Sequence, residues 1–313
     1  MNNVLTAKTL VGNWGTLLLP IKEDDSIDFE RLSEEIEVMI AARINGIYSN
    51  GTAGEFHNQT EDEFDHINRL LSEKCHRAGM PFQIGASHSS PFMSLERLKR
   101  SKVLNPSAFQ VILPDWVIPT AAEQIDFLRK MANVAEEIPL VLYNPPHAKL
   151  VLKPQDFEML SEAVPQLIGI KVADGDAHWY ASMRQYAANL SVFVPGHHLA
   201  TGFREKVGAG AYSNVACINP LAAQQWWELM QTDIDEALKI EQRINDFFAE
   251  AIVPYKNAGY SNPALDKLLA TVGGWATVGT RLRWPYRWIP KEEVASVKKS
   301  AEKHLPSFFS TKL

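Results

Sequence analysis

Short apolar runs recur eight times along the first two thirds of the chain, and branched or aromatic residues dominate them. Runs of this length, bounded by glycine, proline or polar residues, predict buried strands. We expect strands at residues 15–19, 44–49, 82–86, 108–113, 140–143, 167–172, 192–194 and 211–215.

Segments with helical periodicity separate these runs, and their apolar residues recur on one face of each helix. Two of the helix starts carry a capping box, in which Thr60 is followed by Glu63 and Thr120 by Glu123. In this motif the two side chains satisfy the free amides of the first turn. The chain therefore predicts helices between the strands.

Eight units of strand followed by helix favour a closed parallel (β/α)8 barrel, the TIM barrel. The alternative is an open doubly wound sheet, but the first predicted strand lacks the Gly-x-Gly-x-x-Gly sequence that binds dinucleotides in that fold. After residue 220 the strands stop and helical periodicity continues. We predict an α/β protein with a barrel over residues 1–220 and a C-terminal helical subdomain over residues 221–313.

Composition and charge narrow the class of partner. Of the 313 residues, 46% are hydrophobic and 22% are charged, and the formal charge of -6 comes without a long basic run, so we expect no nucleic acid partner. Cys75 and Cys217 are too few for a disulfide framework and lack the spacing of a structural metal site. No apolar run reaches the ~18 residues of a membrane span. We expect a cytoplasmic protein with no membrane partner and a small-molecule ligand.

Lys171 interrupts the apolar run at residues 167–173, where a buried strand is predicted. Burial lowers the pKa of a lysine because it disfavours the ammonium ion, and a free amine can attack a ketone. The alternative is a lysine at the end of a strand that reaches solvent or pairs with a carboxylate.

Two further groups follow predicted strands. The turn at residues 50–55 contains two glycines, so its amides can converge on an anion such as a carboxylate, and Tyr143 ends the fifth strand beside a rigid Asn-Pro-Pro turn. Taken alone, the turn is equally well explained as a tight connection. Taken alone, Tyr143 is better explained as a core aromatic whose hydroxyl is hydrogen-bonded. Because the carboxyl ends of barrel strands share one face, the turn, Tyr143 and Lys171 together suit carbonyl chemistry through an imine.

The motifs Gly51-Thr52-Ala53-Gly54-Glu55, Tyr143-Asn144-Pro145-Pro146 and Gly169-Ile170-Lys171 occur in this order. They resemble those of the dihydrodipicolinate synthase and N-acetylneuraminate lyase superfamily of class I aldolases. The resemblance implies a Schiff-base-forming lyase, often a homotetramer, with no metal and no organic cofactor. It implies that Lys171 forms the imine with pyruvate or another 2-keto acid. It also implies that Tyr143 moves the proton and that the amides of Thr52 and Ala53 hold the carboxylate.

Three positions depart from the pattern of the dihydrodipicolinate synthases. Ala53 stands where the family usually has a second threonine, so one hydroxyl of the carboxylate clamp is missing. Trp116 lies in the segment that carries a tyrosine contributed across a dimer interface, and an indole cannot relay a proton as a phenol does. Ala148 stands where those enzymes place an arginine for the distal carboxylate of the aldehyde.

We therefore expect an aldolase or dehydratase that acts on pyruvate or another 2-keto acid, such as a 2-keto-3-deoxy sugar acid. Dihydrodipicolinate synthase (4-hydroxy-tetrahydrodipicolinate synthase) activity is the alternative. Two further alternatives are a catalytically inactive 2-keto-acid-binding protein on the same scaffold and a metal-dependent lyase. The metal-dependent lyase lacks support, because the sequence has no closely spaced His, Asp or Glu ligands. We expect a homo-oligomer, either a dimer or a tetramer.

Further candidates for substrate binding lie beyond the predicted strands. For Tyr212 on the eighth strand, core packing is an equal alternative. His197 and His198 are adjacent and so point in different directions, which makes a ligand role for both the weaker interpretation. The candidates are Gly51, His147, Trp116, Asp174, Gly196 and Tyr212.

Overall fold

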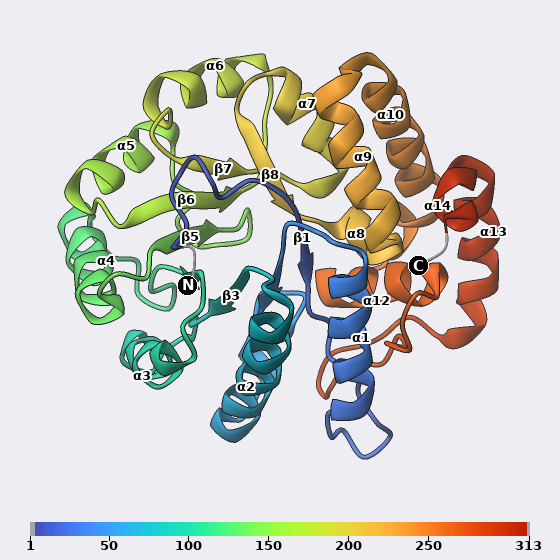
Figure 1. Cartoon of the computed structure of the whole chain (residues 1–313), viewed down its shortest axis with the longest axis horizontal. Coiled ribbons are helices and arrows are strands. Elements are labelled where there is room, and N and C mark those ends of the chain that lie inside the picture. The colour runs from blue at the N-terminus through green and yellow to red at the C-terminus, as the bar shows by residue number, and fades with distance from the viewer. Residues whose placement is uncertain (1–3, 312–313) are drawn as a thin grey trace.

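The structure is a computed structural model that describes residues 4–311. In this range the chain forms a closed barrel of eight parallel strands with helices outside (Figure 1). The first strand pairs with both the second and the eighth, which confirms the predicted (β/α)8 barrel over the open sheet. The strands are β1 (Gly12–Thr16), β2 (Gly46–Ser49), β3 (Phe82–Gly85), β4 (Ala108–Val111), β5 (Leu140–Asn144), β6 (Leu167–Val172), β7 (Ser191–Phe193) and β8 (Gly208–Tyr212).

An α-helix follows each strand on the outside of the barrel. Both predicted capping boxes are confirmed, because Thr60 and Thr120 each accept from the third residue of the helix that they precede. The helices are α1 (Phe29–Ala41), α2 (Glu61–Ala78), α3 (Pro91–Ser101), α4 (Ala121–Ala135), α5 (Pro154–Ala163), α6 (Ala177–Tyr186), α7 (Leu199–Arg204) and α8 (Asn214–Ile218). Short 3-10 turns occur at η1 (Phe56–Asn58), η2 (Lys102–Leu104) and η3 (Gly196–His198).

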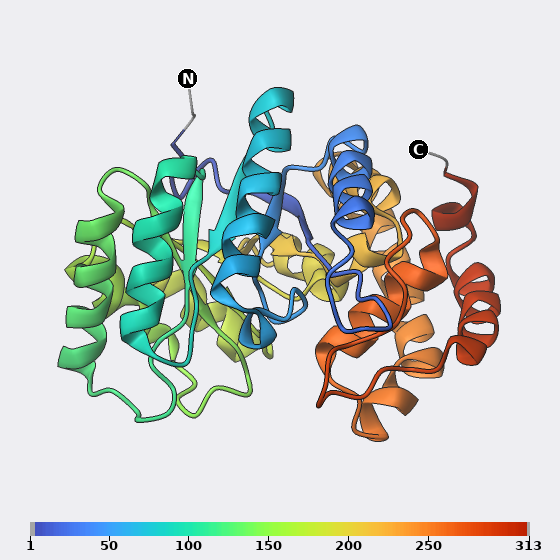
Figure 2. The same cartoon turned by 90° about the horizontal axis from the view of Figure 1, so that it is seen from below.

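The predicted C-terminal helical region is confirmed and lies to one side of the barrel (Figure 2). Its longest helix packs against α7, and the boundary of a separate subdomain at residue 220 stays a prediction. The elements are α9 (Pro220–Thr232), α10 (Ile234–Ala251), α11 (Val253–Asn257), α12 (Asn262–Gly273), η4 (Lys291–Glu293), α13 (Val294–His304) and α14 (Pro306–Ser310).

The predicted positions of the first and last strands are wrong by three residues each. β1 begins at Gly12 and contains a single large apolar residue, Trp14, so its pattern is weak. The apolar run that we assigned to it follows the strand. There the amide of Leu18 donates to the Glu35 carboxyl at 2.8 Å, in place of a carbonyl oxygen of a neighbouring strand.

β8 is rich in glycine, which removes the apolar signal of a strand. A Cβ on Gly210 would lie 2.5 Å from the carbonyl oxygen of Gly12, so the close approach of β8 to β1 requires glycine. Residues 213–215, which we predicted to continue this strand, instead begin α8, with Ser213 as the N-cap. The glycines of β8 thus serve barrel closure.

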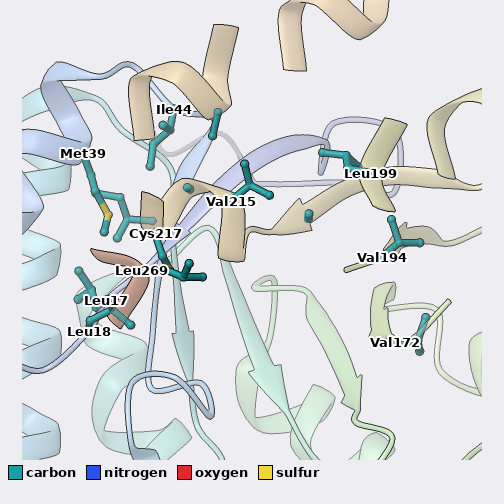
Figure 3. Close-up of a cluster of buried hydrophobic side chains, with 14 of the residues drawn as sticks. Leu17, Leu18, Met39, Ile44, Val172, Val194, Leu199, Val215, Cys217 and Leu269 are labelled. Carbon is teal, nitrogen blue, oxygen red and sulfur yellow. The ribbon is translucent and has the colours of Figure 1, made fainter. Parts of the chain in front are cut away.

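Two layers of apolar side chains position the site. Outside the strands, Leu17 and Leu18 lie close to Met39, and Cys217 lies beside Leu269 of α12 (Figure 3). Inside the barrel, a second cluster of apolar and aromatic side chains fills the space between the strands, as in other barrels of this type. Its fully or almost fully buried members are Leu5, Leu10, Trp14, Tyr48, Ala108, Val141, Phe193 and Tyr212.

The structure offers no membrane span: no helix in the described part of the chain is both long and apolar enough to cross a bilayer.

A buried ion pair ties α12 to the turn after β2. Lys267 and Glu55 are 0% and 1% exposed in their side chains, and Nζ lies 2.6 Å from Oε1. Lys267 also donates to the carbonyl oxygen of Arg281, and the amide of Arg283 donates to Glu55. Since each charge is buried with its partner, loss of either leaves the other without compensation.

We expect Lys267→Met to lower the free energy of unfolding by about 3–5 kcal/mol, because it strands the Glu55 carboxylate in the interior. The double variant Lys267→Met/Glu55→Gln should recover part of that loss. Denaturant titration followed by circular dichroism measures both. Lys239→Met, which breaks an exposed pair on α10, is the control and should change little. A single Lys267→Met variant as stable as the control would contradict this account.

Candidate active site

A cavity of about 480 Å³ lies at the carboxyl ends of the strands. Residues at or just after the ends of β1, β2, β5, β6, β7 and β8 form one side, and residues of α8, α10, α11 and α12 form the other. The polar side chains in its wall are Thr16, Thr52, Tyr143, Lys171, His197, His198, Tyr212, Ser213, Asn214, Asn245, Lys256, Asn262 and Asp266.

Lys171 and Tyr143 lie side by side in this wall. β5 and β6 pair with Tyr143 opposite Lys171, so both side chains point to the barrel interior. The Nζ atom of Lys171 lies 4.2 Å from the centre of the Tyr143 ring and 5.3 Å from those of Tyr48 and Tyr212. The amine therefore sits among three phenol rings and keeps part of its surface open to the cavity.

Burial controls the charge of this amine. Loss of hydration lowers the pKa of Lys171 to about 8, although the charge of Asp266 opposes the shift. In the described chain no carboxylate lies within 4.0 Å of Nζ, so the alternative of a lysine neutralised by a salt bridge does not apply. At pH 7 roughly a tenth of such an amine is unprotonated and able to attack a carbonyl.

The turn after β2 is held in a conformation that few sequences allow. Asn50 and Glu55, at its two ends, have φ values of 55° and 50°. A Cβ on Gly51 would lie 2.4 Å from the hydroxyl of Tyr48, so this position requires glycine. Asn50 Nδ2 donates to the side chain of Asn68 at 3.0 Å, which fixes the start of the turn.

The same turn brings Thr52 and Ala53 to the cavity wall. Within residues 4–311 their amides have no hydrogen-bond partner, so they are free to bind an anion. The Oγ1 atom of Thr52 donates to the phenol oxygen of Tyr143 at 3.3 Å. Because burial raises the pKa of Tyr143, the phenol stays protonated at neutral pH and can donate its own proton.

His198 and Asp174 form a polar pair at the end of β6 and β7. His198 Nδ1 lies 2.9 Å from Asp174 Oδ2, and the hydroxyl of Tyr180 donates to the same oxygen at 3.2 Å. The hydrogen bond with Asp174 raises the pKa of His198 although burial opposes it. Burial and the charge of His198 lower the pKa of the neighbouring His197 to about 4. His198 is thus the more basic of the two imidazoles, and it lies in the cavity wall.

The structure brings together most of the predicted site residues. Gly196 and Tyr212 line the cavity with the residues described above, and His197 and His198 join them. Gly51 is buried beneath the turn, and Asp174 stands behind His198. Their contact with substrate stays a prediction.

Trp116 and His147 lie outside the cavity wall. Trp116 is 84% exposed, and Lys149 Nζ packs 4.6 Å from the centre of its indole. His147 is exposed on the loop after β5. Neither side chain is among the residues that line the cavity, so contact of both with substrate also stays a prediction.

The sequence analysis missed the residues that the C-terminal helices supply. Asp266, Asn262 and Leu265 on α12, Asn245 on α10 and Lys256 on α11 all line the cavity. Helical periodicity indicated which residues pack, but it carried no signal for where those helices dock. Asp266 shows the consequence, because burial raises the pKa of its carboxyl to about 7 while the charge of Lys171 opposes the shift.

No group of three or more His, Cys, Asp or Glu side chains within residues 4–311 is arranged to hold a metal ion. A reaction without metal or organic cofactor stays a prediction.

Comparison with known proteins identifies relatives along nearly the whole chain. The model of the dihydrodipicolinate synthetase family matches residues 9–304. The 4-hydroxy-tetrahydrodipicolinate synthase of Agrobacterium fabrum is 26% identical over 238 residues, which cover 74% of this chain and 80% of that protein. The trans-O-hydroxybenzylidenepyruvate hydratase-aldolase of Sphingobium xenophagum is 24% identical over 298 residues, which cover 90% of this chain and 89% of that protein.

Solved structures show the same fold at lower sequence identity. A pyruvate complex of an E. coli prophage protein of the dihydrodipicolinic acid synthase family has a TM-score of 0.82 and 19% identity, covering 94% of this chain and 98% of that one. The N-acetylneuraminate lyase of Fusobacterium nucleatum has a TM-score of 0.81 and 21% identity, covering 95% and 99%.

We expect Asp174→Asn to lower the pKa of His198, because burial is then opposed only by the weaker effect of Glu241. The wild-type imidazole should titrate above its ordinary value of ~6.5, and the variant imidazole below it. NMR titration of the histidine ring protons measures both values. Asp176→Asn, which keeps the cap of α6, is the matched control. An unchanged His198 titration in Asp174→Asn would refute the pairing.

Proposed function

Since the chain belongs to the dihydrodipicolinate synthetase family, we propose that it is a lyase that forms an imine between Lys171 and pyruvate or a longer 2-keto acid. The observation that carries the proposal is the buried amine itself. Lys171 lies 4.2 Å from the ring of Tyr143, and its pKa of about 8 leaves part of the amine free near neutral pH. A free amine beside a protonated phenol is the pair that imine chemistry requires.

In the proposed reaction the carboxylate of the keto acid accepts hydrogen bonds from the amides of Thr52 and Ala53. This contact fixes the C2 carbonyl beside Lys171, whose amine attacks it; water then leaves and a protonated imine remains. The imine withdraws electrons from C3. In cleavage, the C4 hydroxyl gives up its proton, the bond between C3 and C4 breaks and an aldehyde leaves; the remaining enamine takes up a proton at C3, and water hydrolyses the imine to free the shorter keto acid and Lys171. In dehydration, a proton moves from C3 to water, the C4 hydroxyl leaves as water, and hydrolysis of the imine again frees Lys171. Tyr143 carries the proton to or from the C4 oxygen.

We propose a 2-keto-3-deoxy sugar acid as the substrate class. Among the described residues that line the cavity there is no arginine, and Ala148 offers no cation on the loop after β5. An aldehyde with a distal carboxylate therefore lacks a bidentate partner. His198, Asn214 and Asn245 in the wall can instead hydrogen-bond hydroxyl groups. The hydratase-aldolase relative, which aligns over 90% of this chain, also speaks for a substrate other than aspartate semialdehyde.

Dihydrodipicolinate synthase activity is the second candidate, and Lys256 is the observation that favours it. This lysine lies in the cavity wall on α11 and can meet a distal carboxylate as a point charge. The synthases among the relatives add support, because one of them is 26% identical over 238 residues. A 2-keto-acid-binding protein without catalysis is the third candidate, and the retained Lys171, Tyr143 and Thr52 weigh against it.

We also propose that copies of the chain associate as a dimer or tetramer. Three consecutive apolar residues, Trp116, Val117 and Ile118, are 84%, 76% and 51% exposed. Exposed apolar surface of this kind is unfavourable in water and is typical of a contact between subunits. The expected cytoplasmic location stays a prediction.

Incubation with pyruvate and borohydride should attach one reduced adduct to Lys171, and peptide mapping by mass spectrometry locates it. Lys171→Ala should give none. Tyr143→Phe should still bind the keto acid but form and turn over the imine about 10²–10⁴ times more slowly, because it loses the proton donor. The rate should fall below about pH 8 as Lys171 becomes protonated.

Turnover then separates the candidates. Cleavage or dehydration of 2-keto-3-deoxy sugar acids supports the preferred substrate class, whereas condensation of pyruvate with aspartate semialdehyde supports the synthase. Adduct formation with no turnover on either panel supports the binding protein. Absence of an adduct with pyruvate and with longer 2-keto acids would overturn the imine proposal.

A further inference from the structure

Asp266 places a carboxyl in the cavity from outside the barrel. It lies on α12 in the C-terminal helical region and lines the same wall as Lys171, Tyr143 and Thr52. Its side chain has no hydrogen-bond or ion-pair partner within residues 4–311. A half-buried carboxyl that lines the cavity and has no structural partner is not explained by packing.

The groups around Asp266 place it among the reacting side chains. Its charge acts on Lys171 of β6, on Tyr143 of β5 and on Cys217 of α8. His197, His198 and Lys256 lie elsewhere in the cavity wall. Of the groups that line the cavity, Lys171 is the one whose charge lowers the pKa of Asp266, against the larger effect of burial. Asp266 and Lys171 therefore form an acid and base pair across the cavity.

The next residue along the helix holds Asp266 in place. Successive residues on a helix point about 100° apart, so Lys267 faces away from the cavity when Asp266 faces it. Lys267 is the buried partner of Glu55, at the end of the turn that carries Thr52 and Ala53. One helical segment thus fixes both the carboxyl and the anion-binding turn.

We propose that Asp266 is a further catalytic residue, which takes a proton from the Lys171 ammonium group and returns it to the departing hydroxyl during imine formation. This inference rests on the proposed function. Because no ion pair within 4.0 Å joins the two side chains, the proton passes through a water molecule or the substrate.

The steps balance in protons and charge. The Asp266 carboxylate accepts one proton from the ammonium group, which leaves a neutral amine and a neutral carboxyl. The amine attacks C2 of the keto acid, a bond forms between nitrogen and C2, and a second nitrogen proton moves to the carbonyl oxygen to give a carbinolamine. The Asp266 carboxyl then protonates that hydroxyl, the bond between C2 and oxygen breaks, and water leaves. The products are a protonated imine and the Asp266 carboxylate.

The pKa values fit such an exchange. Burial raises the pKa of Asp266 to about 7 and lowers that of Lys171 to about 8, so the two groups differ little in proton affinity. A small difference makes transfer in either direction feasible near neutral pH.

The test is the rate of imine formation with pyruvate, trapped with borohydride, as a function of pH. Asp266→Asn should slow trapping at pH 7 by about 10²-fold, the lower end of the range for general acid and base catalysis. It should also move the acid limb of the profile to lower pH, because Lys171 loses the carboxylate that stabilises its ammonium form. Asp266→Glu should keep the limb near its wild-type position and recover part of the rate. Asp246→Asn on α10, exposed and outside the cavity, is the matched control.

Stability separates catalysis from folding. The raised pKa of Asp266 means that ionisation in the folded state costs stability as pH rises through about 7. Asp266→Asn should therefore be at least as stable as the wild type at pH 8 by thermal unfolding. If Asp266→Asn forms the imine at the wild-type rate with an unmoved acid limb, the proposal for Asp266 is wrong while the imine proposal stands. If Asp266→Asn does not fold, Asp266→Ala is the second variant without a carboxyl, and a wild-type rate with an unmoved acid limb in that variant refutes the proposal. An adduct missing in the wild type refutes the proposed function instead.

Discussion

The cost of burying one amine governs the rest of this structure. Lys171 gives up hydration to stand among three tyrosine rings, and the cation and ring contacts restore only part of what the ammonium form loses. The remainder appears as a pKa of about 8. A surface lysine would be almost fully protonated at neutral pH, whereas burial in the barrel leaves part of this amine unprotonated, as the proposed nucleophile must be.

That conversion needs a rigid enclosure, and the barrel alone does not supply it. The strands form one side of the cavity, and α10, α11 and α12 close the other. The Glu55 and Lys267 pair couples the two sides, because it joins the turn after β2 to α12 through a contact with almost no exposure to solvent. The helical region therefore serves as a wall of the site and not as an appendage.

The sequence was sufficient for much of the fold and part of the site. Lys171, Tyr143 and the turn at Thr52 could be grouped because the carboxyl ends of parallel strands in a barrel meet at one face. β1 and β8 were placed three residues late, since β1 holds a single large apolar residue and the glycines of β8 serve close backbone approach and leave little apolar pattern. Asp266 could not be found, because its role depends on how α12 docks, which the periodicity of that helix does not encode. Trp116 is exposed and outside the cavity wall of the single chain, so its place in the site stays a prediction.

The central claim is that desolvation, and not a salt bridge, sets the charge of Lys171. Competitive labelling with a trace of acetic anhydride, read out by peptide mass spectrometry across a pH series, gives the pKa of that one amine in the unliganded protein. The account predicts half-maximal labelling near pH 8, with the exposed lysines titrating above it. A Lys171 that titrates together with the exposed lysines, at about pH 10 or higher, would contradict the account.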